Sequence, residues 1–212
     1  MIIKQLNLHH LKPGLRIPER NILHVWILAL DHTGNMHKSI HTQSHSLLFR
    51  MLSLYTGIPG ESLELGTGQY GKPFLKNNLE SEGVPLVLHF NLSHSGSMAA
   101  FVFSSSSPVG IDIERLHRSA RMNRIAARVF FPNEAAQLEA LSEQDSQDEK
   151  SHLFFRLWTR TESFLKGIGT GFSASLTDKK IQDEYTHWEI RYPDAPDGYI
   201  CCLAYKNPPD AS

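Results

Sequence analysis

Two carboxylates lie two residues apart in the apolar segment GIDIE, residues 110–114. Successive side chains of a strand alternate between faces, so Asp112 and Glu114 point one way while Ile111 and Ile113 point into the core. Two carboxylates on one face suit a hard cation such as Mg²⁺, which prefers oxygen ligands and substrate phosphates. Read alone, this spacing more often marks two solvated acids near the end of a strand.

A second group of polar residues lies in the segment WTRTESFLK, residues 158–166. On a helix, Trp158, Glu162 and Lys166 are each four residues apart and form one stripe. If Glu162 met the first two carboxylates, the three would complete a metal site facing a diphosphate, and Lys166 would neutralise phosphate charge. The alternative is an ordinary surface pair between Glu162 and Lys166, with Trp158 in the core.

Two further segments resemble the wall of a ligand site more than a core. Lys72 and Pro73 follow a glycine in a predicted turn, which places a cation on a restricted backbone. The segment NLSHSG, residues 91–96, brings hydrogen-bonding side chains, among them Ser93 and His94, to the end of a strand. Neither segment is informative by itself, because a single histidine is more often structural than a ligand group.

These residues need strands and helices to position them. Apolar periodicity predicts strands over residues 23–30, 86–92, 98–103, 109–114, 188–192 and 199–205. Helical spacing covers residues 37–55, 119–130, 133–141 and 153–166, with a polar, acid-rich loop over 142–151. Residues 95–103 and 197–205 share a pattern of glycine turn, small-residue strand and later proline, which permits two related α+β halves meeting near residues 104–110.

The composition is that of a globular protein, with 212 residues and 41% hydrophobic residues. The formal net charge of −1 gives no reason to expect a protein that binds nucleic acid or a membrane surface. Cys201 and Cys202 are neighbours, which disfavours a disulfide between them, so we expect core residues in a reducing compartment. The apolar run over 22–30 is short for a membrane span and lacks a signal-peptide cleavage site, so a cytoplasmic protein is expected.

The motifs GKP, FNLSHSG, GIDIE and WxxxESxxK, in this order along residues 71–166, resemble the 4′-phosphopantetheinyl transferases of the surfactin-synthetase-activating type. The likeness covers about half of the chain and points to the short bacterial members that modify carrier proteins, similar to holo-ACP synthase. It implies an α+β fold with a pseudo-two-fold pair of similar subdomains, residues 1–107 and 108–212. Coenzyme A is then expected in the cleft between them.

The resemblance also implies an activity. The enzyme would move the 4′-phosphopantetheine group from coenzyme A to a serine of an apo acyl carrier protein and release adenosine 3′,5′-bisphosphate. Asp112, Glu114 and Glu162 would bind Mg²⁺ together with the pyrophosphate, and Lys166 would approach the same pyrophosphate. Glu162 is the first candidate for the base that takes the serine proton, directly or through a metal-bound water. Contacts to the nucleotide end are implied for Lys72, Pro73, Ser93 and His94.

His45 and Thr161 mark departures from the pattern of the family. His45 occupies the place of an arginine that binds the 3′-phosphate in many relatives, and a weaker contact from His45 is expected. His37, His41 and His45 are spaced as one helical stripe, but they lack a neighbouring cysteine or carboxylate, so we do not predict a transition-metal site. Thr161 replaces a lysine of the family, and Arg160 could compensate.

A run of arginines follows the GIDIE segment with no acidic residue before Phe131. Their spacing of three or four lets them share one helical face, where Met122, Ile125 and Val129 could add apolar contacts. Because carrier proteins of this class are acidic, these residues are the expected docking surface of the carrier. The alternative is a solvated basic helix. The arginines are Arg115, Arg118, Arg121, Arg124 and Arg128.

Two other functions remain open at this point. A nucleotide pyrophosphatase or nucleotidyltransferase would also need Mg²⁺, carboxylates and lysines, but it would not need the arginine run. A catalytically silent module that binds coenzyme A or a carrier protein would not need all three acids. The internal pattern favours a monomer.

Overall fold

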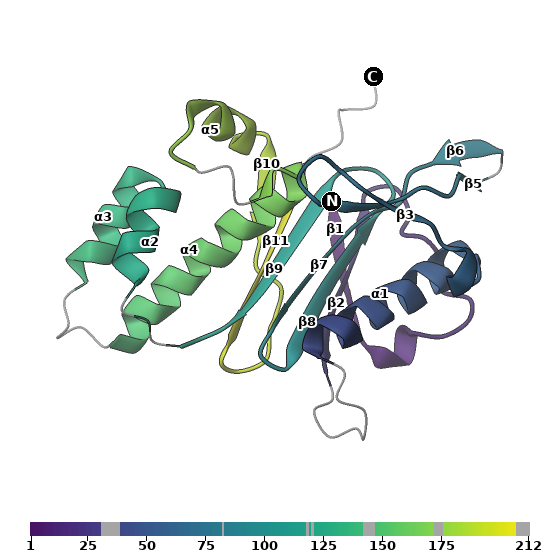
Figure 1. The fold of residues 1–212 in the computed structure, drawn as a ribbon, viewed down its shortest axis with the longest axis horizontal. Coiled ribbons are helices and arrows are strands. Elements are labelled where there is room, and N and C mark those ends of the chain that lie inside the picture. The colour runs from purple at the N-terminus through teal and green to yellow at the C-terminus, as the bar shows by residue number, and fades with distance from the viewer. Residues whose placement is uncertain are drawn as a thin grey trace.

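The computed structural model describes residues 1–30, 39–81, 83–117, 119, 121–141, 147–171 and 176–206. They form a mixed α+β chain in which two sheets stand side by side, each with a long helix on one face (Figure 1). No helix within these ranges has both the length and the apolar character that a membrane span requires.

The first sheet has the strand order β1-β2-β8-β7. Its strands are β1 (Ile2–Leu6), β2 (Ile22–Ala29), β7 (His89–Ser95) and β8 (Met98–Ser104), and only β1 and β2 pair in parallel. Helix α1 (Ile40–Thr56) covers one face, where Leu48 and Met51 share an apolar cluster with Trp26 and Phe101. The helix begins where the Ser39 side chain accepts the Thr42 amide, and it ends at Gly57 in the left-handed region (φ 71°).

The second sheet has the order β10-β11-β9 and is antiparallel throughout. It consists of β9 (Val109–Arg115), β10 (Trp188–Arg191) and β11 (Tyr199–Lys206), and helix α4 (Gln147–Ile168) packs on it. The approach of α4 to β9 depends on Gly110. A β-carbon at this position would lie 2.0 Å from the Ser163 carbonyl oxygen and 2.4 Å from the Gly167 amide nitrogen.

The two sheets meet at β7 and β9. The faces turned away from the long helices share one apolar cluster, which includes Val25 and Ala100 of the first sheet and Ile111 and Leu203 of the second. Along the seam, the Asn91 side-chain oxygen accepts the Ile111 amide at 2.9 Å. This pairing aligns β7 with β9 and brings the carboxylates of β9 beside the polar residues of β7.

Shorter elements complete the described chain. The hairpins β3 (Leu65–Thr67) with β4 (Pro73–Leu75) and β5 (Leu79–Ser81) with β6 (Val84–Leu86) extend from the first half. Helices α2 (Met122–Val129), α3 (Pro132–Ala140) and α5 (Lys179–Tyr185) belong to the second half, and the 3-10 turns are η1 (Leu8–His10) and η2 (Gly60–Ser62).

Most predicted elements are confirmed, with boundaries shifted by a few residues. The mixed α+β class is correct, whereas the two-fold relation between the halves stays a prediction. The prediction of a polar loop over 142–151 is wrong for residues 147–151, because these residues form the start of α4. Its acids Asp148 and Glu149 lie in the first turn, where negative charge favours a helix N-terminus. Strand β1 and helix α5 had no predicted counterpart.

We expect Gly110→Ala to destabilise the fold, because the added methyl group would meet backbone atoms of α4 that cannot move away independently. The loss should be at least about 3 kcal/mol, at the upper end of what overpacking costs. Gly60→Ala is the matched control, since a β-carbon there has nothing within 4 Å. Urea denaturation of both variants measures the difference. Equal stabilities would show that the helix and the strand are not held at the distance described above.

Candidate active site

Three carboxylates from two elements come together on the α4 side of β9. Asp112 and Glu114 come from the strand and Glu162 from the helix; Asp112 is only 2% exposed and Glu162 only 5%. Burial raises the pKa of Glu162 to about 7, and the charges of Asp112 and Glu114 add to this effect. The pKa of Glu114 is also raised, by burial and then by Asp112. The low exposure of Asp112 rules out the alternative of two solvated acids.

Lys166 is the cation of this cluster. Its Nζ lies 2.5 Å from Asp112 Oδ1 and donates to Ser93 Oγ at 3.0 Å. The predicted alternative of a surface pair with Glu162 is therefore wrong, because Lys166 reaches across to β9. Its positive charge lowers the pKa of Glu162 and of Glu114, but burial and the neighbouring acids outweigh it.

The charges and lone pairs of the cluster are suited to a divalent cation. When ionised, the three carboxylates exceed the single ammonium of Lys166 by two negative charges, and Asp112 Oδ2 is buried without a hydrogen-bond partner among the described residues. An unpaired buried carboxylate oxygen is costly unless a cation or donor meets it. Within the described ranges, no group of three or more His, Cys, Asp or Glu side chains is arranged so that it could hold a metal ion by itself. A cation here would therefore draw further oxygen ligands from water or a bound phosphate.

Two serines of β7 face the carboxylates of β9. Ser93 Oγ donates to Asp112 Oδ1 at 2.7 Å, which places this predicted site residue at the cluster. Ser95 Oγ donates to Glu114 Oε2 at 2.6 Å, and Ser95 was not predicted. A signal for it existed in the sequence, because Ser93 and Ser95 are two residues apart on a strand, as are Asp112 and Glu114.

The histidines form a separate group where α1 approaches β7. The rings of His41 and His45 stack with centroids 4.2 Å apart, and His94 meets His41 edge-on at 5.9 Å. Burial, and then the proximity of His41, lowers the pKa of both His45 and His94. The positive charge of Lys166 also lowers the pKa of His94, so the histidine group borders the carboxylate cluster. His37 lies outside the described residues.

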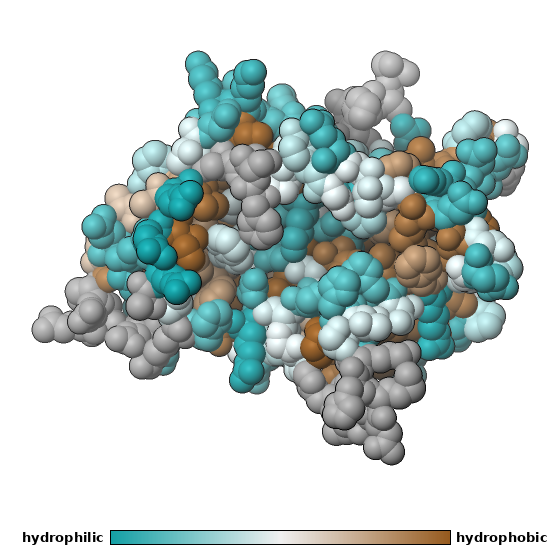
Figure 2. All heavy atoms as spheres, in the orientation of Figure 1, coloured by the Kyte–Doolittle hydropathy of each residue, from teal (hydrophilic) through white to brown (hydrophobic). Residues whose placement is uncertain are grey.

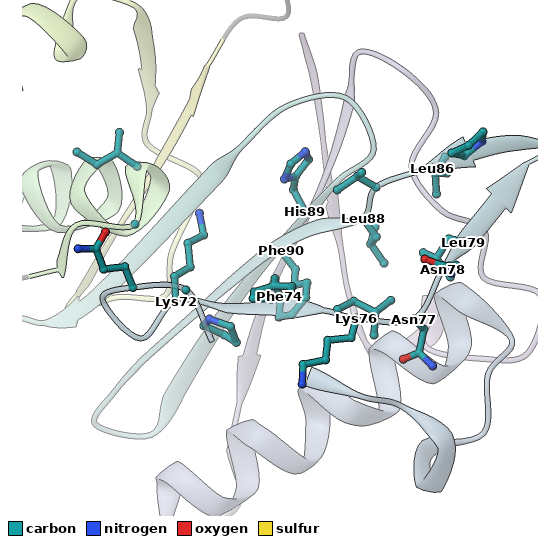
Figure 3. Close-up of a pocket in the computed structure, with 18 of the residues that line it drawn as sticks. Lys72, Phe74, Lys76, Asn77, Asn78, Leu79, Leu86, Leu88, His89 and Phe90 are labelled. Atoms are coloured by element: carbon teal, nitrogen blue, oxygen red, sulfur yellow. The ribbon is translucent and has the colours of Figure 1, made fainter. Parts of the chain in front are cut away.

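Lys72 is placed differently from the other predicted site residues. Its Nζ donates to the carbonyl oxygens of Val109 (2.9 Å) and Gly167 (2.7 Å), and burial lowers its pKa to about 8. The ammonium thus ties the start of β9 to the end of α4. Lys72 and Pro73 also line a cavity of about 860 Å³ with Phe74, which Figure 3 shows beside the first residues of β7.

This cavity is distinct from the carboxylate cluster, since none of the three acids lines it. Three exposed apolar side chains are among those that line it, namely Tyr70, Phe74 and Val87. Apolar atoms are visible on the surface around the two short hairpins in Figure 2.

Arg160 makes a structural contact, so the expectation that it compensates for the family lysine that Thr161 replaces is wrong. Its guanidinium makes a two-point ion pair with Glu134 of α3, one bond at 2.6 Å, and it faces the rings of Phe131 and Tyr185. Thr161 is buried and donates its hydroxyl to the Leu157 carbonyl oxygen.

The arginine run lies on an exposed surface of the second half. Arg115, Arg121, Arg124 and Arg128 are exposed, whereas Arg118 lies outside the described residues. Met122 is buried in the cluster beneath α2, with Ile125 and Val129 packed partly against it. The predicted apolar contribution of Met122 to docking is therefore wrong, because this side chain belongs to the core.

The part of the chain that carries the carboxylates is similar to known proteins. Residues 108–203 match the model of the 4′-phosphopantetheinyl transferase superfamily. The transferase HetI of Nostoc sp. is 31% identical over 137 residues, which are 65% of this chain and 54% of the relative. Sfp of Bacillus subtilis is 35% identical over 57% of this chain and 47% of its own length. AcpT of Escherichia coli is 34% identical over 50% of this chain and 49% of its own length.

These relatives are all named 4′-phosphopantetheinyl transferases, and the predicted resemblance is confirmed over the matched region. The chain spans about half the length of the curated relatives that it matches.

The raised pKa of Glu162 predicts a pH-dependent cost to stability. In the folded state its pKa is about 7, against an ordinary value of 4.5. Stability should therefore fall as the pH rises from 4.5 to about 7, because only the unfolded chain ionises freely in that window. In metal-free buffer, Glu162→Gln should be more stable than wild type by about 1–3 kcal/mol near pH 8 and equal to it below about pH 4.5.

Urea denaturation with a chelator present, at several pH values, measures this difference. Glu64→Gln is the control, because Glu64 is exposed. A Glu162→Gln variant whose stability follows that of wild type at every pH would contradict the assigned environment of this carboxylate.

Proposed function

We propose that this chain, whose residues 108–203 are those of the 4′-phosphopantetheinyl transferase superfamily, transfers 4′-phosphopantetheine from coenzyme A to a serine of an apo acyl carrier protein. The observation that carries the proposal is the convergence of Asp112, Glu114 and Glu162 with Lys166 inside the matched region. The division of the strands between two sheets, each with a long helix, supports the predicted subdomains 1–107 and 108–212.

We further propose that the reaction depends on Mg²⁺ held by Asp112, Glu114 and Glu162. The unpartnered Asp112 Oδ2 and the excess negative charge of the cluster support this assignment. When bound, Mg²⁺ would neutralise charge on the diphosphate of coenzyme A and on the leaving phosphate.

In the transfer, the carrier serine Oγ bonds to the phosphorus that bears pantetheine, and the bond from that phosphorus to the bridging oxygen breaks. Adenosine 3′,5′-bisphosphate leaves with the bonding electron pair. The serine proton moves to Glu162, the carboxylate of the cluster that we assign as the base. Lys166, held against Asp112 and Ser93, contributes a fixed positive charge beside the reacting diphosphate.

The nucleotide end of coenzyme A is proposed to lie against the histidines. His45 and His94 provide imidazole nitrogens on the wall between α1 and β7, and the proximity of Lys166 makes this wall favourable for phosphate. Lys72 and Pro73 would support the nucleotide through their backbone and ring, since the Lys72 ammonium already donates to two carbonyl oxygens.

We propose the exposed arginines as the docking surface for an acidic carrier protein, with Arg115, Arg121, Arg124 and Arg128 as its described members. A cytoplasmic monomer remains our expectation for the working form, because the two free cysteines are buried and each half carries its own sheet.

The proposal is tested by incubating the protein with coenzyme A, Mg²⁺ and an apo carrier protein and weighing the carrier. The carrier should gain the mass of one phosphopantetheine group, on a serine. Asp112→Asn and Glu162→Gln should lower the rate at least 100-fold, since each removes a charge from the reacting centre, whereas Glu64→Gln should be neutral. Breakdown of coenzyme A without a carrier would instead indicate a pyrophosphatase or nucleotidyltransferase. Binding of coenzyme A with no reaction in wild type would indicate a binding module.

A charge reversal tests the docking surface. Arg124→Glu should raise the KM for the carrier about 10-fold and leave kcat nearly unchanged, because Arg124 is exposed on α2 and is not part of the carboxylate cluster. The KM should also rise with salt in wild type and less steeply in the variant. Arg20→Glu, an exposed arginine of the first half, is the control. Equal KM values for both variants would leave α2 as a solvated basic helix.

A further inference from the structure

The turn between β7 and β8 lies directly against the second half of the protein. Gly96 in this turn has φ 56°, and a β-carbon there would lie 2.5 Å from the Tyr199 hydroxyl oxygen and 3.1 Å from Arg115 Cδ. The turn belongs to the first sheet, whereas Tyr199 and Arg115 pair with each other across β11 and β9. The glycine is therefore needed both for the backbone conformation and for the close approach.

A single hydroxyl group holds the turn in this place. The Ser97 amide donates to the Tyr199 hydroxyl oxygen at 3.0 Å, and the Ser97 Oγ lies 3.1 Å from the same oxygen. The next residue, Met98, is buried at the start of β8. Tyr199 thus connects the sheets at the end of the seam that the carboxylates occupy.

On the other side of Gly96, Ser95 contacts both the side chain of Glu114 and the backbone that follows it. Its Oγ donates to Glu114 Oε2 at 2.6 Å and accepts the Arg115 amide at 3.1 Å. With its one proton and a lone pair in use, the serine hydroxyl has a fixed orientation. Glu114 is therefore oriented from the first half of the protein, although it belongs to the second.

We propose that Ser95 and Tyr199 are positioning residues for the carboxylate cluster. Tyr199 fixes the turn, the turn fixes Ser95, and Ser95 holds Glu114 in the orientation in which it acts together with Asp112 and Glu162. The inference rests on the proposed function for its metal ion, but the chain of contacts from Tyr199 to Glu114 is independent of carrier and substrate.

This arrangement matters because Glu114 is less buried than Asp112 and Glu162 and so depends more on its hydrogen-bond partners for its orientation. Asp112 is held by Lys166 and Ser93 and is almost fully buried, whereas Glu114 lies next to the exposed end of β9. Partners that orient a metal-binding side chain commonly contribute about 10- to 100-fold to metal affinity. Without Ser95, Glu114 would lose the short hydrogen bond from the first half and would keep only the contact with Trp158 of α4.

The experiment compares Ser95→Ala, Ser95→Thr and Tyr199→Phe with two controls. Ser46→Ala removes a hydroxyl from the exposed side of α1, and Tyr205→Phe removes one at the far end of β11. Binding of Mn²⁺ alone is measured from the electron paramagnetic resonance signal of the free ion. Transfer to an apo carrier is measured in parallel as a function of Mg²⁺ concentration, and the melting temperature of each variant is recorded.

We expect Ser95→Ala to weaken Mn²⁺ binding about 10-fold and to raise the half-saturating Mg²⁺ concentration by a similar factor. The kcat at saturating Mg²⁺ should fall far less. Tyr199→Phe should weaken Mn²⁺ binding by a smaller factor, about threefold, because it acts through the turn. Ser95→Thr keeps the hydroxyl and should bind Mn²⁺ nearly as wild type does, and both controls should be unchanged.

Mn²⁺ affinities of Ser95→Ala and Tyr199→Phe within twofold of wild type would overturn the inference, even if their melting temperatures fall. A failure of Ser95→Thr to restore binding would also overturn it. If wild type binds Mn²⁺ and the variants bind it less well, but no carrier is modified, the positioning role stands and the proposed transfer fails.

Discussion

The site depends on one unfavourable electrostatic arrangement, in which two buried carboxylates and a partly buried one lie near a single ammonium group, that of Lys166. Lys166 offsets part of the charge through its contact with Asp112, but the pKa of Glu162 still rises to about 7. A protein interior tolerates such a conflict only where the surrounding structure is rigid or where a cation relieves it. Here the surroundings are the packed α4 helix, strand β9 and the serines of β7, so the rest of the molecule fixes groups that repel one another.

That rigidity has its origin in residues outside the carboxylate cluster. Gly110 lets the backbone of α4 approach β9 closely enough for Glu162 to face Asp112. The Lys72 ammonium then ties the end of the helix to the start of the strand through two carbonyl oxygens. The buried ion pair of Arg160 with Glu134 joins α4 to α3 and so holds the opposite side of the helix. The side chains of Lys72 and Arg160 thus make structural contacts, because a buried cation needs acceptors and finds them in backbone carbonyl oxygens or in Glu134.

The sequence predicted correctly which side chains share one face of a strand or helix, because the period of the element determines this. The alternation of Asp112 and Glu114 with buried Ile111 and Ile113 predicted the face of β9 correctly, and the spacing of Glu162 and Lys166 predicted one face of α4. Contacts that depend on how the halves meet could not be predicted. The hydrogen bond from Ser95 to Glu114 and the contact of Tyr199 with the β7–β8 turn join residues of different sheets, and no local pattern encodes their distance. The helical start of α4 at Gln147 was missed because its polar residues resemble a loop.

The seam between β7 and β9 explains why the site needs both halves. All three acids and Lys166 belong to the second half, yet Asp112 and Glu114 each accept a hydrogen bond from the first, Asp112 from Ser93 and Glu114 from Ser95. Neighbouring histidines of α1 and β7 extend this polar surface on the first half. A change in the relative position of the sheets would therefore disturb the acids and the histidines together. Because the apolar faces behind the seam form one continuous cluster, such a change requires repacking of the core, and the geometry of the site is as stable as the core itself.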